Sequence, residues 1–189
     1  MTRNRSFDEV EVLNGAMMAF REHGFAGASI KDLERATGLT SGSLYNAFGD
    51  KEGLYRATAQ HYLDSFVRVR VETFAGKNAT LDDLEGLFLS LLEAPLTDGY
   101  GCMATNAIVE FGGGESIATS FVRKAIGLVS AGVRRVLERE LGPDKADTAT
   151  EHLVVLYHGM LVFSRAGWAD ERLATMVRDQ FNRLRAERT

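Results

Sequence analysis

Proline interrupts helices, and this chain of 189 residues contains only two prolines, Pro95 and Pro143. A proline inside a helix costs about 3 kcal/mol, so long stretches without one are compatible with long helices. In the first such stretch, Val10, Leu13 and Met17 recur at intervals of three and four residues, which places them on one face of a helix. We therefore expect an all-α fold.

The same periodicity, broken at glycines and polar residues, predicts about nine helices. Residues 112–114, which are all glycine, separate two of them. They lack the Lys and Ser/Thr of a phosphate-binding loop, so they indicate a hinge or linker. The predicted helices cover residues 7–22, 29–37, 40–48, 51–74, 81–93, 103–111, 115–141, 144–166 and 170–188.

The composition is that of a soluble globular protein, with 45% hydrophobic and 25% charged residues. The single cysteine, Cys102, cannot form an intramolecular disulfide, and the first residues do not have the pattern of a secretory signal. The longest nearly apolar run, residues 153–163, is far shorter than the roughly 20 residues that cross a bilayer. We expect a cytoplasmic protein with no membrane partner.

Residues 29–48 have the pattern of a helix-turn-helix motif, in which two short helices are joined by a tight turn containing Gly38. Apolar positions, among them Leu33 and Leu44, would hold both helices against the first helix. The other side chains at the start of the second helix are small or polar, which suits entry into a major groove about 12 Å wide. The pattern favours DNA binding; from periodicity alone, an ordinary helical corner is the alternative.

The charge pattern limits how such a motif would hold DNA. The formal net charge is −4, and residues 1–60 contain seven Lys and Arg against eight Asp and Glu. Binding would therefore depend on a few placed cations together with hydroxyls, backbone amides and helix N-termini.

Three segments, residues 30–33 (IKDL), 36–39 (ATGL) and 42–55 (GSLYNAFGDKEGLY), resemble the N-terminal signature of the tetracycline-repressor (TetR) family. The resemblance covers about residues 7–55. It implies a homodimeric, all-helical transcription factor, usually a repressor, whose C-terminal domain binds a small-molecule effector and thereby changes the affinity for operator DNA. Ala47 stands where many members have a histidine, so one expected phosphate contact does not carry over.

By this resemblance, Ser29 and Lys31 lie where the first short helix touches phosphate, residues 40–45 where the recognition helix meets the groove, and Lys51 beside the DNA backbone. Arg3 and Arg5 form either an arm that reaches phosphate or the minor groove, or a solvated tail. The expected partner is double-stranded, pseudo-palindromic operator DNA. The predicted DNA-binding residues are Arg3, Arg5, Ser29, Lys31, Thr40, Ser41, Gly42, Ser43, Tyr45, Asn46 and Lys51.

We assign residues 1–50 to a helix-turn-helix DNA-binding domain and residues 51–189 to a helical ligand-binding and dimerisation domain. The predicted helix 144–166 is apolar on nearly every side, so it must be covered all round. A partner's copies of this helix and the last one would complete a two-fold four-helix interface; a wholly intrachain core is the alternative. The predicted interface residues are Leu153, Leu156, Tyr157, Met160, Leu161, Leu173, Met176, Val177 and Phe181.

Aromatic residues of the body are candidates for an effector pocket, although such residues also form ordinary cores. Cys102 begins a predicted helix, where a thiolate is stabilised, so it is either a sensor of oxidants or electrophiles or a small buried residue. The predicted pocket residues are Phe66, Phe88, Cys102, Phe111, Phe121, Tyr157 and Trp168.

Neither a metal site nor a catalytic site is indicated. The four histidines include no i, i+4 pair and there is no second cysteine, so we expect no metal and no cofactor. No Ser/His/Asp arrangement stands out by its spacing, and we expect no catalytic residue. A helical enzyme or small-molecule carrier remains the alternative from another functional class.

Overall fold

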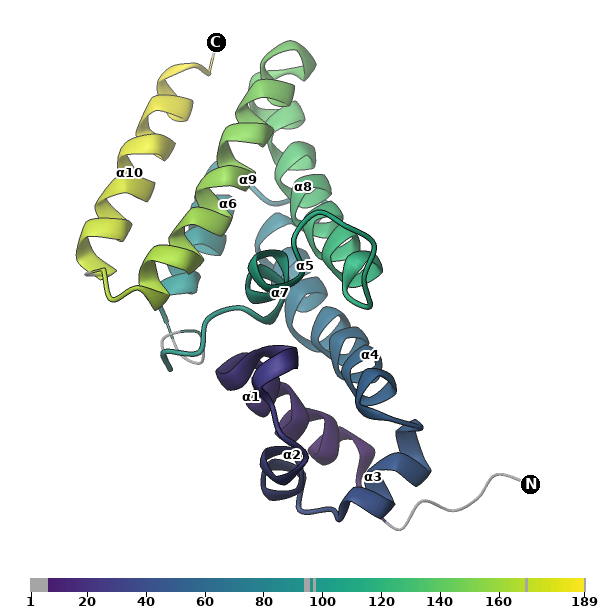
Figure 1. Cartoon of the computed structure of the whole chain (residues 1–189). Coiled ribbons are helices and arrows are strands. Elements are labelled where there is room, and N and C mark those ends of the chain that lie inside the picture. The colour runs from purple at the N-terminus through teal and green to yellow at the C-terminus, as the bar shows by residue number, and fades with distance from the viewer. Residues whose placement is uncertain (1–6, 94–95, 97, 169, 189) are drawn as a thin grey trace. The chain divides into compact units, whose positions relative to one another are not determined.

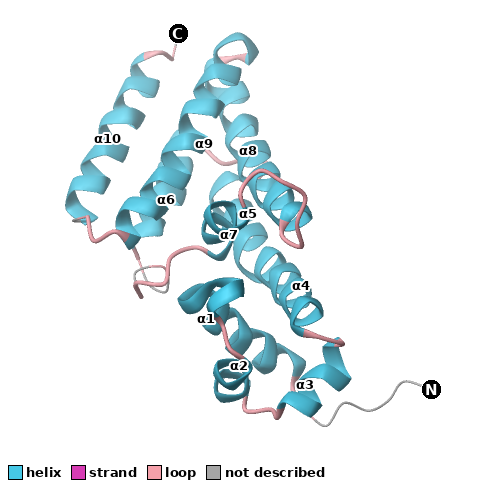
Figure 2. Cartoon of the chain, viewed as in Figure 1, coloured by secondary structure: helices cyan, strands magenta, loops and turns pink. Residues whose placement is uncertain are grey.

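A computed structural model of the chain describes residues 7–93, 96, 98–168 and 170–188. All regular secondary structure in these residues is helical, as Figure 2 shows. Because α4, η1 and α5 follow one another without a break, and η2 continues α6, the described residues form the nine helical stretches that the periodicity predicted. The elements labelled in Figure 1, together with η1 and η2, are α1 (Glu9–Gly27), α2 (Ile30–Thr37), α3 (Ser41–Phe48), α4 (Lys51–Tyr62), η1 (Leu63–Val67), α5 (Arg68–Ala75), α6 (Leu81–Leu89), η2 (Ser90–Leu92), α7 (Met103–Phe111), α8 (Thr119–Leu141), α9 (Pro143–Arg165) and α10 (Asp170–Ala186).

Local capping explains where the helices differ from the predicted ranges. α1 begins at Glu9 because the Asp8 carboxylate accepts a hydrogen bond from the backbone N–H of Val10 at 2.8 Å. α8 begins at Thr119 rather than at residue 115, because the Thr119 hydroxyl accepts a hydrogen bond from the backbone N–H of Ser116 in a preceding turn. Pro143 occupies the first position of α9, where its missing N–H leaves no helical hydrogen bond unmade.

The chain forms two compact units, of which the first comprises residues 1–64 and 102–122. In this unit α1 packs against α2, α4 and α7, and α3 packs against α2 and α4. A Cβ atom on Gly15 would lie 2.0 Å from the Ala36 carbonyl oxygen, so only glycine permits this approach of α1 to α2. The core of the unit includes Leu13, Ala16, Met17, Phe20, Leu33, Leu44, Leu54 and Tyr55.

The second unit comprises residues 65–101 and 123–189. Here α6 packs against α5 and α10, and α10 also contacts α9. The Phe88 ring lies 5.7 Å from that of Tyr157 and 5.4 Å from that of Phe181, between ring centroids, so α6, α9 and α10 share one aromatic core. The Arg185 guanidinium pairs with the carboxylates of Asp82 and Glu85, which ties α10 to α6.

One expectation about the core is wrong. The periodicity places Val10 on the inner face of the first helix, but Val10 is 55% exposed, whereas Val12 and Ala16 are buried. Leu13 and Met17, on the same face as Val10, are buried, so this face is covered from Leu13 onward and only its first residue, in the first turn of α1, stays exposed. Among the described residues, no helix is both long and apolar enough to span a membrane.

Candidate DNA-binding interface

Residues 29–48 form the predicted helix-turn-helix. α2 is capped at its N-terminus by Ser29 and ends at Gly38, whose φ of 70° is left-handed and therefore favours glycine. α3 begins after Thr40, whose hydroxyl accepts a hydrogen bond from the backbone N–H of Ser43 at 3.3 Å. Leu33 of α2 and Leu44 of α3 are fully buried. Their burial determines the faces of the two helices that remain exposed.

The outward face of α3 carries the side chains that the sequence assigned to base recognition. Tyr45 is 40% exposed, and Gly42, Ser43 and Asn46 are also exposed. The Thr40 and Ser43 hydroxyls lie 3.1 Å apart, so they form a hydrogen-bonded pair at the start of the helix. Ser41 is half-buried, and its backbone N–H donates to the Glu34 carboxylate at 2.6 Å. The face is polar, and the start of α3 is capped by the Thr40 hydroxyl and the Glu34 carboxylate.

Ser29 takes part in a reciprocal cap with Asp32. The Ser29 hydroxyl donates to the Asp32 carboxylate at 2.5 Å, and the Ser29 backbone N–H donates to it at 3.0 Å. These two hydrogen bonds, with a smaller contribution from nearby His23 and Arg35, lower the pKa of Asp32. Because the Ser29 hydroxyl proton is used within the chain, a phosphate at this helix end would meet the N-terminus of α2 and the exposed side chain of Lys31.

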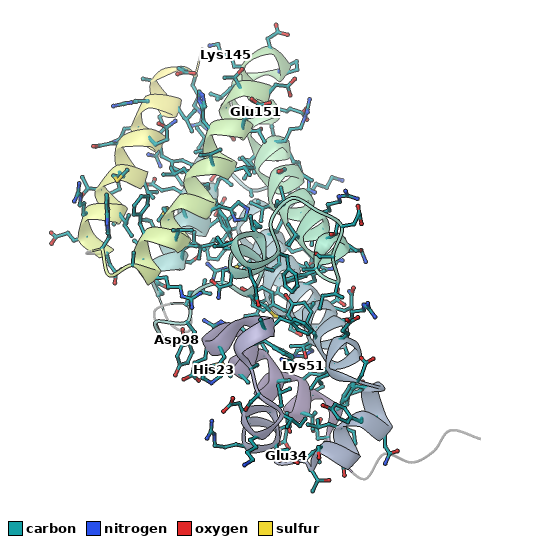
Figure 3. All side chains as sticks on the ribbon, in the orientation of Figure 1. His23, Glu34, Lys51, Asp98, Lys145 and Glu151 are labelled. Atoms are coloured by element: carbon teal, nitrogen blue, oxygen red, sulfur yellow. The ribbon has the colours of Figure 1, made fainter. Side chains whose placement is uncertain are left out.

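Lys51, labelled in Figure 3, is the first residue of α4 and follows the N-cap residue Asp50. Its ammonium is 4.8 Å from the centroid of the Phe25 ring, a cation–π distance, and the side chain is half-buried. The remaining predicted DNA contacts, Arg3 and Arg5, lie outside the described residues. The structure thus brings Ser29, Lys31, Lys51 and the start of α3 together in one unit.

The same segment matches the family model described as "Bacterial regulatory proteins, tetR family" over residues 12–58. The chain is 48% identical over 50 residues to the HTH-type transcriptional repressor AcnR of Corynebacterium glutamicum and 42% identical over 64 residues to the HTH-type transcriptional repressor ComR of Escherichia coli. Its fold matches a TetR family regulator, CifR, with a TM-score of 0.75 and 27% identity, over 95% of this chain and 98% of that one. Residues 12–58 thus match the TetR family, and the fold of nearly the whole chain is similar to that of a TetR regulator.

The extent of the likeness differs between sequence and fold. The matched segments cover 26% of this chain and 27% of AcnR, and 34% of this chain and 30% of ComR. The CifR structure is of a cysteine-substituted variant in complex with 26-base-pair operator DNA. A TetR regulator from Legionella pneumophila has the same fold, with a TM-score of 0.80 at 17% identity, over 96% of this chain and 98% of that one. The sequence likeness to these repressors lies in the N-terminal helices of the chain, whereas the fold likeness extends over nearly the whole chain.

The predicted pocket residues fall into separate clusters. Phe88 and Tyr157 pack together in the second unit, and Trp168 lies there against Phe163, 4.3 Å between centroids. Phe66, in η1 of the same unit, is half-buried. In the first unit, the Phe111 ring lies 5.8 Å from those of Phe25 and Tyr55. The effector pocket therefore stays a prediction, and the rings of Phe88, Phe111, Tyr157 and Trp168 pack against other aromatic rings within their own units.

Cys102 precedes the first residue of α7 and is 6% exposed. Its sulfur accepts a hydrogen bond from the Tyr62 hydroxyl at 3.1 Å, and the Tyr62 ring packs edge-on against Phe121 at 6.3 Å. This arrangement is that of a small residue packed in a core, one of the two interpretations left open by the sequence.

Most of the predicted dimer residues are buried within the second unit itself. Leu156 is half-buried, and only Met176 of the predicted set is exposed. The apolar side chains that α9 does present to solvent are Val155, Val162 and Phe163. The interface stays a prediction, and these exposed residues are the better candidates for it. The residues buried within the second unit are Leu153, Tyr157, Met160, Leu161, Leu173, Val177 and Phe181.

Two positioning residues had no signal in the sequence reasoning. Glu34 caps α3 from a position seven residues earlier, and Phe25 supports Lys51 from the end of α1. An acidic residue on a short helix is ordinarily a solvated surface residue, so nothing local distinguishes Glu34. The positions of both residues follow from how the helices pack.

Proposed function

We propose that this protein is a ligand-responsive transcriptional repressor that binds a pseudo-palindromic operator as a homodimer and is released by a small-molecule effector. The observation that carries the proposal is the outward polar face of α3, with Tyr45 and Asn46 exposed on a helix whose apolar residue Leu44 is fully buried. The names of AcnR and ComR, both transcriptional repressors, and the operator complex of CifR support it.

The proposed recognition divides base reading from phosphate contact. α3 enters the major groove, where the hydroxyl of Tyr45 and the amide of Asn46 bond base edges or phosphates. Lys31, Lys51 and the N-terminus of α2 hold the DNA backbone and set the register. Because the net charge is −4, few counterions are displaced, and the dependence of affinity on salt is shallower than for a strongly basic protein.

The proposed dimer uses the outer faces of α9 and α10. Val155 and Val162 lie two helical turns apart on α9, and Met176 is exposed on α10, so a partner can cover apolar surface that one chain leaves in water. Two-fold symmetry then places the recognition helices about 34 to 36 Å apart, which demands half-sites one turn of DNA apart. An effector that prefers another spacing weakens operator binding, and by linkage operator DNA weakens effector binding equally.

The test is a mobility-shift titration against the DNA that flanks the protein's own gene. We expect retention that is specific and salt-sensitive. We expect Tyr45→Ala to weaken it by about 1–3 kcal/mol, or roughly fivefold to more than a hundredfold, because the variant cannot bond a base edge at this position. Val69→Ala is the matched control, since Val69 is an exposed apolar residue of α5 in the second unit. Equal retention of every DNA, or no retention, would contradict the proposal and favour a helical enzyme or carrier.

A further inference from the structure

Helix α1 is interrupted at Gly24, which has φ 73° and ψ 176° and is not helical. The chain then makes one more turn, in which the backbone N–H of Ala28 donates to the Gly24 carbonyl at 3.2 Å. The first N–H groups of any helical turn lack acceptors within the helix. Those of Phe25 and Ala26 therefore need an acceptor from elsewhere.

Glu110, near the C-terminal end of α7, is that acceptor. One carboxylate oxygen of Glu110 accepts from the Phe25 N–H at 2.9 Å and the other accepts from the Ala26 N–H at 2.7 Å. Gly24 leaves room for this carboxylate, because a Cβ atom there would lie 2.9 Å from the nearer oxygen. The side chain of Glu110 thus caps the broken end of α1 from a residue 85 positions later in the chain.

The ring of the capped residue, Phe25, also contacts the side chain of Lys51, a predicted DNA-binding residue. The Lys51 ammonium lies 4.8 Å from the centroid of that ring. The ring is held in turn by Tyr55, at 5.2 Å and nearly perpendicular, and by Phe111 at 5.8 Å. Glu110 and Phe111, adjacent on α7, therefore fix the backbone and the ring of Phe25, and Phe25 supports the cation that begins α4.

We propose that Glu110 is a positioning residue for DNA binding, which acts through Phe25 to hold the Lys51 ammonium where it contacts a phosphate. The proposal rests on the proposed function, since it requires that Lys51 meet DNA. A lysine ammonium on its four-carbon stem is mobile, and a support that limits its rotamers reduces the entropy cost of forming the phosphate contact. Without Glu110 the turn at Phe25 loses its two charge-assisted hydrogen bonds, so the ring keeps its contacts with Tyr55 and Phe111 but the backbone that carries it beneath Lys51 is no longer fixed.

The sign of the effect separates this role from simple electrostatics. Removing a negative charge near bound DNA raises affinity, whereas removing a positioning residue lowers it. Glu22→Ala is the matched control, because Glu22 is an exposed carboxylate on α1, three residues before Phe25, and its ion pair with His23 is loose, at 3.6 Å. We expect Glu22→Ala to leave operator affinity unchanged or slightly higher.

The experiment measures operator affinity over a range of salt concentrations for full-length wild type, Glu110→Ala, Glu110→Gln, Lys51→Ala and the Glu110→Ala/Lys51→Ala double variant. We expect both Glu110 variants to bind about fivefold more weakly, and Lys51→Ala to reduce the salt slope by about 0.9 for each phosphate that the lysine no longer neutralises. The double variant should bind no more weakly than Lys51→Ala alone, because both changes act on the same phosphate contact.

Glu110→Gln keeps the side-chain volume, and its single carbonyl oxygen can serve only one of the two N–H groups, so it tests the role if the alanine variant folds poorly. Circular dichroism and thermal unfolding establish that each protein is folded. Additive decreases in affinity in the double variant, or unchanged affinity and salt slope in both Glu110 variants, would overturn the inference. Wild-type protein that binds no DNA specifically would instead overturn the proposed function.

Discussion

The Glu34 carboxylate accepts a hydrogen bond from the backbone N–H of Ser41, the first residue of α3, at 2.6 Å (Figure 3 labels Glu34 on α2). Side chains that cap a helix N-terminus contribute about 1 kcal/mol. We expect Glu34→Ala to lower the free energy of unfolding by about that amount and to reduce the ratio of operator to non-specific DNA affinity. Glu52→Ala, which removes an exposed carboxylate that pairs with Arg56 in the same helix, should do neither. Equal stability of the two variants would show that the cap contributes nothing.

The contact of α1 with α2 gives a test of packing. Gly15→Ala would place a methyl group 2.0 Å from the Ala36 carbonyl oxygen, so backbone must move. We expect the free energy of unfolding in urea to fall by about 2–3 kcal/mol, together with weaker operator binding, because α2 would be displaced. Gly127→Ala in α8 is the opposite case, with open space around the added atom. It should stabilise the protein by about 0.5–1 kcal/mol, and a comparable decrease at both glycines would contradict the packing argument.

His158 gives the protein a pH dependence of stability. Burial lowers its pKa below the ordinary value of 6.5, so the unfolded chain binds a proton at a higher pH than the folded protein does. The contribution of His158 to the free energy of unfolding is therefore fully present above about pH 6.5. It decreases as the pH falls below that value, by at most about 1.4 kcal/mol per pH unit. We expect His158→Gln to flatten the pH dependence of urea unfolding measured between about pH 7.5 and 5.5, and His152→Gln, at an exposed position of the same helix, to leave the dependence unchanged.

The exposed apolar face of α9 leads to a test of the proposed dimer. We expect sedimentation at micromolar concentration to give twice the 20.8 kDa of one chain. Val155 is 73% exposed and Val162 is 44% exposed. Val155→Glu and Val162→Glu should shift the mass toward one chain and leave the helix content unchanged, because a buried interface excludes unpaired charge. Val69→Glu, on exposed α5 surface, should leave the mass unchanged, and a wild-type mass of one chain would contradict the dimer.

Local structure could be predicted from the order of the amino acids alone. Ser29 and Asp32 predict the start of α2, Gly38 predicts its end, and Asp50 predicts the start of α4, because each cap forms within one turn of chain. The spacing of apolar residues likewise predicted the helices, and the motif in residues 30–55 predicted the family whose model matches residues 12–58. These caps and spacings can be recognised in the sequence because every group that takes part lies within a few residues of the others.

Which side chains these helices bury, and which ones they support, depends instead on how the helices pack. Leu153 and Phe181 fill the core of their own unit and are not left for a partner to cover, and Val10 is exposed. Glu110 reaches Phe25 across 85 residues, and Lys51 lies on a ring that belongs to another helix. Periodicity places a residue on a face of its helix. Which neighbour covers that face depends on packing between segments that are distant in the chain, so it cannot be read from the residues of a single turn.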